Sequence, residues 1–199
     1  MTFAENVQQL LGELAMGRAH LDLRFEAEPA ETAWSETGID LAECYLSANV
    51  GEEPRPLARI ASGGELSRVM LAIRTLAAAA APGKTLIFDE IDAGIGGRVA
   101  DVVGRKLRRL GRTFQVMCIT HLPQIAAAGH VHFRISKSVV NGRTHTRVAR
   151  LTESERVEEV ARMIGGAAPT PASRAAAREL LSASRRGESE ANAKGESET

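Results

Sequence analysis

The sequence predicts an α/β fold, because two kinds of segment alternate along its 199 residues. Short apolar runs at 85–88 and 114–119 have the length and composition of strands in a sheet that is covered on both faces. Longer segments at 62–81 and 98–110 carry apolar residues at helical spacing. This order indicates a mostly parallel sheet flanked by helices, and an Asn-Gly pair further on adds a C-terminal hairpin.

The N-terminal part is expected to form one helix and two strands. Apolar residues recur at helical spacing over 4–16, and this helix begins almost at residue one without a developed cap. We therefore expect residues 1–20 to be a helix, or the end of a coiled coil, that belongs to a longer protein. Residues 21–26 alternate and 39–50 are strand-like, so both are predicted strands, with a connection at 28–38.

The last third of the chain is expected to be mixed and to end in a tail. Its predicted elements are a helix at 122–128, strands at 131–139 and 143–151, a helix at 153–164 and a last helix from Thr170 to about Arg185. Residues 21–183 are expected to form one lobe. The segment 184–199 is expected to be disordered, because Glu, Ser, Ala, Asn and Lys leave it without an apolar face.

Composition limits the compartment and the partners. The chain holds 25 Lys and Arg against 25 Asp and Glu, so it has no net field to attract nucleic acid, although a local patch is not excluded. Cys44 and Cys118 lie far apart in the sequence, which favours two free thiols in a reducing compartment. No stretch is long and apolar enough for a membrane span, and the start lacks the regions of a signal peptide. We therefore expect a cytoplasmic protein without a membrane partner.

The segment from Ser62 to Arg68 reads Ser-Gly-Gly-Glu-Leu-Ser-Arg and opens a helix. Ser62 with Glu65 three residues later is a capping box, which is a purely structural interpretation. The same helix start, with no Cβ at Gly63 and Gly64, also exposes backbone N–H groups to an anion such as a phosphate. Both interpretations hold together, because a capped helix still presents its dipole to a nucleotide.

Two carboxylates, Asp89 and Glu90, end the first apolar strand. The carboxyl edge of a parallel sheet is where α/β folds bind ligands. There Asp89 can hold Mg²⁺, and Glu90 can orient and polarise a water molecule that attacks a γ-phosphate. The structural alternative is a pair of solvated acids that cap the next helix, and the uncharged strand before them weakens that alternative.

Two further segments follow the apolar strands. The loop 91–97 holds Asp92 and three glycines, which suits close packing against a second subunit or, alternatively, a flexible turn. His121 ends the second apolar strand, so we expect it to open on the same edge as Glu90 and to contact a γ-phosphate, although a lone histidine is more often structural. The other histidines are predicted to be surface residues without zinc; they are His20, His130, His132 and His145.

One phosphate-loop signal is rejected. The triplet Gly83-Lys84-Thr85 matches the end of a P-loop, but Ala78 stands where the motif requires its first glycine. The predicted helix also precedes the strand instead of following it. Lys84 is therefore predicted to be a turn residue, and this sequence lacks a phosphate-binding loop.

The three blocks together resemble the ATP-binding cassette superfamily. Ser62–Arg68 resembles its signature motif, Leu86–Gly97 its Walker B motif with the following D-loop, and Cys118–Ala127 its H-loop. Within the superfamily, the likeness is to the RecN family of SMC-like DNA-repair ATPases. Glu65 supports this, because transporter cassettes usually carry Gln there, and the likeness covers residues 4–181.

The resemblance implies a head built from both ends of a longer chain through an antiparallel coiled coil, with this sequence as the C-terminal lobe. It also implies ATP and Mg²⁺ as ligands, and two heads that sandwich two ATP molecules in an ATP-dependent homodimer. The Walker A motif would come from the missing N-terminal lobe, so this fragment alone is expected to be inactive.

The resemblance also assigns residues to this sandwich. Ser62, Gly63 and Gly64 would reach the γ-phosphate held by the opposite head, and Glu65 belongs to the same motif. Asp92 would communicate across the interface. DNA contact would come through the full assembly, in double-strand-break repair and recombination at the nucleoid.

Two alternatives are kept. One is a head fragment of another SMC-like or transporter ATPase, which Glu65–Arg68 and the Ala-Gly-Ile-Gly-Gly loop disfavour. The other belongs to a different class and is a non-catalytic lobe that keeps the fold and binds a partner head. Asp89, Glu90 and His121 argue against it, because a non-catalytic lobe has no physical need for all three.

Overall fold

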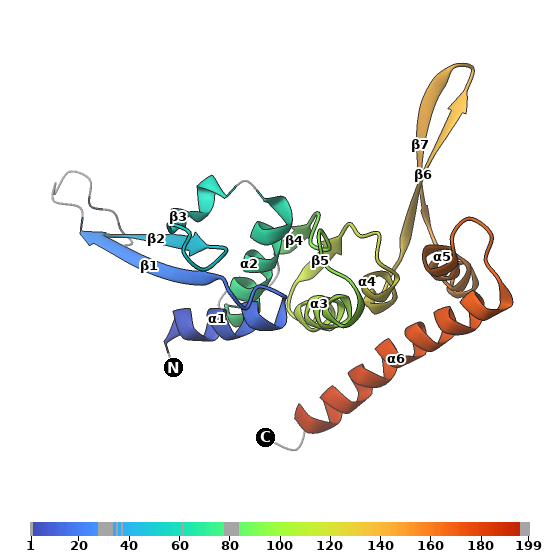
Figure 1. The fold of residues 1–199 in the computed structure, drawn as a ribbon. Coiled ribbons are helices and arrows are strands. Elements are labelled where there is room, and N and C mark those ends of the chain that lie inside the picture. Colours follow the sequence, from blue (N-terminus) through green and yellow to red (C-terminus); the bar gives the residue numbers. More distant parts are fainter. Residues whose placement is uncertain are drawn as a thin grey trace. The chain divides into compact units, whose positions relative to one another are not determined.

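The computed structural model divides the chain into two compact units whose elements are drawn in Figure 1. The first unit comprises residues 1–95 and 113–119, and the second comprises 96–112 and 120–199. Helices and strands alternate, which confirms the α/β class. The structure describes residues 2–27, 34, 36, 38–60, 62–77 and 84–195.

Two helices, α1 (Phe3–Glu13) and α2 (Gly63–Leu76), pack together in the first unit. The sequence prediction of an uncapped start for α1 is wrong. Thr2 Oγ1 accepts the Glu5 N–H at 3.3 Å, and the Glu5 carboxylate accepts the Thr2 N–H at 2.7 Å. This capping box satisfies two backbone groups that the first turn of a helix leaves unpaired. The buried apolar residues at this helix pair are Val7, Leu11, Leu14, Val69, Leu71 and Ala72.

The start of α2 agrees with the prediction, since Ser62 is its N-cap. Its end is earlier than expected, with Leu76 as the last helical residue and Ala77 as the C-cap. The predicted stop at Pro82-Gly83 lies outside the described residues.

An antiparallel sheet of three strands completes the N-terminal part. β1 (His20–Ala27) pairs with β2 (Asp40–Ser47), and β2 pairs with the short β3 (Arg55–Pro56), which leads into the 3₁₀ helix η2 (Leu57–Arg59). Leu21 lies opposite Leu46, and both are buried, so this end of the ribbon is anchored in the core. Most of the predicted connection at 28–38 lies outside the described residues.

Parallel pairing among the described strands is limited to β4 (Thr85–Phe88) and β5 (Gln115–Cys118). Both strands were predicted, but the expectation that they are covered on both faces is wrong for the described chain. Phe88 is buried, whereas Ile87 and its partner Met117 are 67% and 55% exposed. In α/β folds helices cover both faces of the parallel sheet, but this face stays open within the described residues.

The second unit is mainly helical. Its helices are α3 (Gly97–Leu110), α4 (Pro123–Ala128), α5 (Glu153–Gly165) and α6 (Pro171–Gly195). α4 packs against α3, α5 and α6, and α5 packs against α6. The core of this packing consists of Ala127, Val160, Ala161, Ala177 and Leu181.

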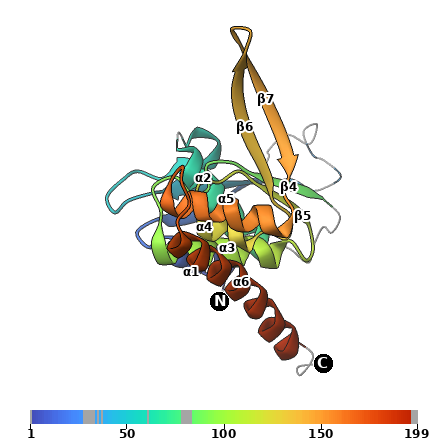
Figure 2. The same ribbon diagram turned by 90° about the vertical axis from the view of Figure 1, so that its right-hand side faces the viewer.

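A hairpin of β6 (Phe133–Val140) and β7 (Arg143–Arg150) extends from the second unit (Figures 1 and 2). Asn141 and Gly142 both have positive φ, at 51° and 72°, which confirms the predicted type I′ turn. Thr152 then caps α5, with Glu155 closing a capping box, and Gly166 ends the helix with a φ of 86°.

The prediction of a disordered segment from residue 184 is wrong up to Gly195, because α6 continues to that residue. Thr170 caps the helix as predicted, accepting the Ser173 N–H at 3.1 Å. Seven of the twelve residues at 184–195 are Arg, Glu, Ala or Lys, which are good helix formers, and extending an existing helix is far easier than nucleating one. Among the described helices, none is both long and apolar enough to cross a membrane.

Candidate functional site

The N-terminus of α2 presents the predicted signature residues. Ser62 Oγ accepts the Glu65 N–H at 3.4 Å, which is one of the two hydrogen bonds of the predicted capping box. Anion binding at this helix start stays a prediction. Ser62 and Gly63 are exposed, whereas Gly64 is buried. The first two residues of this helix start therefore reach solvent, and the next residue is packed against protein.

Two glycines allow this helix start to touch the loop that follows β4. A Cβ at Gly63 would lie 2.6 Å from Oε2 of Glu90. A Cβ at Gly64 would lie 2.7 Å from the Cβ of Ala93 and 3.0 Å from the Glu90 carbonyl oxygen. Neither position accepts a side chain without movement of its neighbours, so close packing against this loop is one reason for the Gly-Gly pair.

Two side chains of α2 tie it to the same loop. The Ser67 hydroxyl donates to the Asp89 carbonyl oxygen at 2.6 Å, and Arg68 Nη1 donates to the Ala93 carbonyl oxygen at 2.8 Å. Arg68 is buried, and burial lowers its pKa while nearby Glu65 opposes the shift. Sequence reasoning quoted Arg68 within the motif but gave it no role; its position one turn after Gly64 was the available signal.

Asp89 and Glu90 lie exposed at the end of β4, as predicted. Asp89 Oδ1 accepts the Glu90 N–H at 2.9 Å, and Glu90 has a φ of 54°. This left-handed conformation is uncommon for a residue with a side chain and costs on the order of 1–3 kcal/mol, so the surrounding contacts must maintain it. Such strain in a loop of carboxylates is typical of functional sites.

Asp92 lies in the turn that follows and is buried, with 4% of its surface exposed. Backbone bonds close the turn, since the Ala93 N–H donates to the Glu90 carbonyl and the Ile95 N–H donates to the Asp92 carbonyl. The loop is thus a defined turn within the first unit, and the predicted contact of Asp92 with a second head stays a prediction.

The pKa of the Cys118 thiol depends on the carboxylates near the end of β4. Cys118 lies opposite Phe88 in the parallel pair, and its pKa is raised to about 12, mainly by burial and further by Asp92 and Asp89. The two carboxylates therefore act together on the carboxyl edge of β4 and β5. Both cysteines are free thiols, as expected.

His121 is exposed and follows Thr120, whose hydroxyl accepts the Leu122 N–H at 3.0 Å. It belongs to the second unit, so the expectation that it opens on one edge with Glu90 stays a prediction. His20, His130 and His145 are exposed as predicted.

The prediction that His132 is a surface residue is wrong. His132 is half-buried, its Nδ1 is shielded from solvent without a hydrogen-bond partner, and its pKa is lowered by burial and by Arg156. Its position at the base of the hairpin, next to α5, explains this shielding. Across the described residues, His, Cys, Asp and Glu side chains do not gather in groups of three or more that could hold a metal ion.

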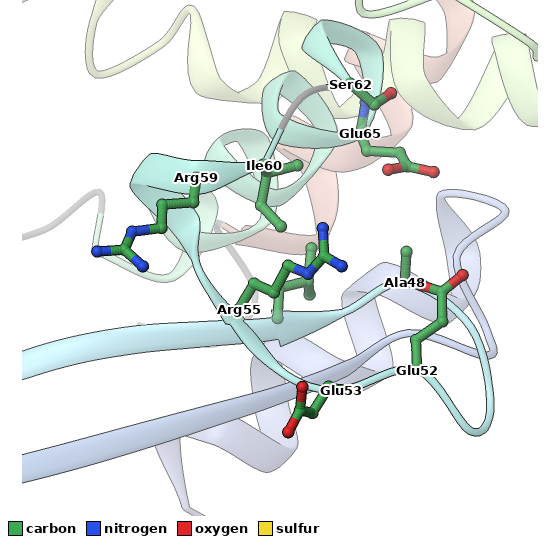
Figure 3. A pocket seen from close by; sticks show the side chains of 9 residues that line it. Ala48, Glu52, Glu53, Arg55, Arg59, Ile60, Ser62 and Glu65 are labelled. Atoms are coloured by element: carbon green, nitrogen blue, oxygen red, sulfur yellow. The ribbon is translucent and has the colours of Figure 1, made fainter.

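A cavity of about 440 Å³ opens beside Ser62 and Glu65. Its walls come from the turn after β2, from β3 and from η2, and they mix acidic and basic side chains with an apolar base. Figure 3 shows Arg55 extending toward the middle of the labelled residues and Arg59 pointing outward. The remaining lining residues are Leu46, Ala48, Glu52, Glu53 and Ile60.

No family model matches the chain. The DNA repair protein RecN of Xylella fastidiosa (strain 9a5c) is 46% identical over 172 residues, which cover 86% of this chain and 31% of that protein. The DNA repair protein RecN of Halalkalibacterium halodurans is 42% identical over 182 residues, which cover 91% of this chain and 32% of that protein. The chain belongs to the RecN family. It spans about a third of the length of each of these relatives.

Comparison with solved structures supports the fold class. The Smc head domain with a coiled coil and joint from Pyrococcus yayanosii matches with a TM-score of 0.50 at 21% identity, over 79% of this chain and 28% of that chain. At this identity the likeness concerns the fold alone. The chain accordingly has an SMC head-domain type of fold.

Proposed function

We propose that this chain is the C-terminal lobe of an SMC-like ATPase head that acts in DNA double-strand-break repair and recombination. The observation that carries the proposal is the set of contacts joining α2 to the loop after β4. Gly63 lies against Glu90, and Ser67 bonds to Asp89. These contacts give the signature-like and Walker-B-like segments one shared geometry within a single unit.

The residues fit a nucleotide at this place. The exposed start of α2 offers N–H groups to a phosphate. A Cβ at Gly63 would crowd the Glu90 carboxylate, so glycine there lets the helix start lie close to the proposed catalytic residue. In the proposed homodimer, Ser62, Gly63 and Gly64 contact the γ-phosphate of ATP held by the second head. The backbone N–H of Glu65 donates to the Ser62 cap, so Glu65 belongs to the same helix start. Asp92 supports the loop that meets that second head.

Asp89 is the proposed Mg²⁺ ligand, because its carboxylate is exposed beside the phosphate position. Bound Mg²⁺ would neutralise phosphate charge during hydrolysis. Glu90 orients the attacking water and holds its proton at the carboxylate, and the contact with Gly63 limits where that carboxylate lies. His121 is assigned to the γ-phosphate.

The Walker A motif is proposed to come from an N-terminal lobe. The uncovered face of the parallel pair supports this, since Ile87, Met117 and Ile119 are each more than half exposed. Apolar side chains clustered on one sheet face are typical of a surface that another protein segment covers. DNA is proposed to contact the full assembly in the cytoplasm, at the nucleoid.

The same uncovered face also suits a non-catalytic lobe that only binds a partner head. The strained Glu90 argues against this alternative. A binding surface gains nothing from a left-handed glutamate beside Asp89, whereas a catalytic loop uses it to aim a carboxylate.

The proposal is tested by steady-state ATP hydrolysis of this chain mixed with an N-terminal lobe that carries a Walker A motif. We expect turnover only when both pieces are present, and a fall of about 10²–10⁴-fold with Glu90→Gln. Glu26→Gln, an exposed carboxylate on β1 away from the loop, serves as the matched control and is expected to leave turnover unchanged. Absent turnover despite demonstrated association of the lobes would favour the non-catalytic alternative.

A further inference from the structure

The β6–β7 hairpin has a net positive charge, whereas the chain as a whole is neutral. The chain as a whole is neutral, with 25 basic and 25 acidic residues, yet no Asp or Glu occurs between Phe133 and Arg150. The basic residues of the hairpin are Arg134, Lys137, Arg143, Arg147 and Arg150. A neutral protein therefore holds a concentrated local positive field on one ribbon.

These cations are exposed and mostly unneutralised. Arg134 lies 3.8 Å from the Glu159 carboxylate of α5. The other four make no ion pair within the part of the chain that the structure describes. The register explains why, because each cation lies opposite an uncharged residue, such as Ser136 opposite Arg147 and Val140 opposite Arg143.

The strand register sorts the hairpin into two faces. Side chains alternate along a strand, and directly opposed residues share a face. One face, called the cationic face, carries three of the five basic residues and two of the four hydroxyl residues. Its polar members are Arg134, Ser136, Ser138, Arg143, His145 and Arg147, and the register also places Val140 and Ala149 on it. The other face, called the apolar face, also includes Lys137, Arg150, Thr144 and Thr146. Its large apolar members are Phe133, Ile135, Val139 and Val148, all more than half exposed.

We infer that the cationic face of this hairpin is a docking surface for the phosphate backbone of duplex DNA. Guanidinium groups and serine hydroxyls are donors that contact phosphate oxygens without reading sequence. A two-stranded ribbon also fits the major groove of B-DNA, which is about 12 Å wide. The hairpin projects from the helices of its own unit in both views, so the face is accessible within that unit (Figures 1 and 2).

Duplex DNA fits better than the other polyanions. The deep and narrow major groove of duplex RNA does not admit a ribbon. A membrane-binding ribbon keeps charges off the face that it inserts, whereas Lys137 lies between Ile135 and Val139 on the apolar face. The apolar face is left to pack against protein. The choice of DNA as the polyanion rests on the proposed function in DNA repair. Binding at the cationic face does not require ATP hydrolysis.

The test uses the whole 199-residue chain without ATP, so that its failure is distinct from a failure of the ATPase proposal. Binding to a random-sequence 30-base-pair duplex is measured by fluorescence anisotropy between 50 and 200 mM salt. We expect the double substitution Arg143→Gln/Arg147→Gln to weaken binding at least about tenfold at 50 mM salt. The slope of log K against log salt is expected to become shallower by about 1.8, at about 0.9 per phosphate contact.

Two matched variants distinguish binding at the cationic face from a general effect of the chain's positive charge. Arg105→Gln/Arg109→Gln removes the same charge from the exposed side of α3 and is expected to change binding less than twofold. Arg143→Lys/Arg147→Lys keeps the charge and is expected to keep the salt slope. Equal weakening by the α3 and hairpin variants, undetectable DNA binding at 50 mM salt, or preferred binding to duplex RNA or anionic vesicles would overturn the inference. Circular dichroism of each variant confirms that the hairpin change leaves the fold intact.

Discussion

The loop after β4 and the β6–β7 hairpin differ in what holds their functional side chains. In the loop, side chains of α2 hold the backbone, because the Ser67 hydroxyl donates to the Asp89 carbonyl and Arg68 donates to the Ala93 carbonyl. On the hairpin, all of the described side chains except that of Ala149 are exposed, and most of the cations have no acidic partner in the described chain. Chemistry on a phosphate requires fixed geometry, whereas contact with a phosphate backbone requires mainly charge at the right spacing.

The largest expected effect concerns Cys118, which senses the charge of the loop. Its pKa, raised to about 12, keeps the thiol protonated at pH 8, and only the thiolate reacts with iodoacetamide. In a Cys44→Ser background, we expect native Cys118 to alkylate about 10²–10³ times more slowly than the same residue in the urea-unfolded chain. Peptide mass spectrometry measures both rates.

A charge variant sharpens this prediction. Because Asp89 contributes to the raised pKa, Asp89→Asn should lower the pKa of Cys118 and speed its alkylation in the folded chain. The matched variant Asp101→Asn on α3 should have no effect. Equal rates in the native and unfolded wild type would contradict the partly buried and negative environment of Cys118.

Two glycines, one in each region, are expected to respond to alanine for different reasons. Gly64→Ala should destabilise by about 1–3 kcal/mol, because its Cβ would overlap Ala93. Gly142→Ala has open space around its Cβ, but its φ of 72° should still cost about 1 kcal/mol. Urea unfolding measures both free energies.

The control for this pair is Gly12→Ala in α1, where nothing lies within 4 Å and φ is helical. That change should stabilise by about 0.5–1 kcal/mol. Similar losses at positions 12 and 64 would show that crowding against the loop is not the reason for glycine at 64.

The smallest expected effect is at the base of the hairpin, where Glu159 pairs with Arg162 and Arg134. The hydrogen bond from Arg162 lowers the pKa of Glu159 below its ordinary 4.5. A lowered folded pKa means that the stabilisation is present above that value and is lost as the pH falls through the folded pKa. Glu159→Gln should therefore cost about 1 kcal/mol at pH 7, since Arg162 is half exposed, and progressively less below pH 4.5.

Glu158→Gln tests the same idea on a more exposed pair with Arg174, and we expect a smaller change. Urea unfolding at several pH values provides the comparison. A penalty for Glu159→Gln that stays constant from pH 7 to pH 3 would show that the ion pairs at the hairpin base do not contribute.

The sequence was sufficient for elements that local rules determine. Glycine turns, caps and apolar periodicity located the hairpin and α5, and the apolar runs located β4 and β5. Prediction from the sequence failed for elements whose structure depends on more than residue composition. The helical continuation of α6 was missed because the absence of an apolar face was given more weight than helix propensity, and the cap at Thr2 was overlooked.

In the candidate site, too, the sequence located some features and missed others. The motif residues were found from the sequence, but the close contact of Gly63 with Glu90 and the bond from Arg68 to Ala93 join segments more than twenty residues apart. Spacing cannot reveal which carbonyl a buried arginine meets. The two faces of the hairpin also depended on register, although its run of cations without acids was visible in the sequence.

One measurement tests most directly whether the loop after β4 supports ATP hydrolysis and the hairpin supports DNA binding. ATP turnover and duplex DNA affinity are measured on the reconstituted head with Glu90→Gln and, separately, with Arg143→Gln/Arg147→Gln. The account predicts that Glu90→Gln abolishes turnover and keeps DNA affinity, and that the hairpin variant loses DNA affinity and keeps turnover measured without DNA. If each variant lowers both activities, or if Glu90→Gln leaves turnover unchanged, the account is contradicted.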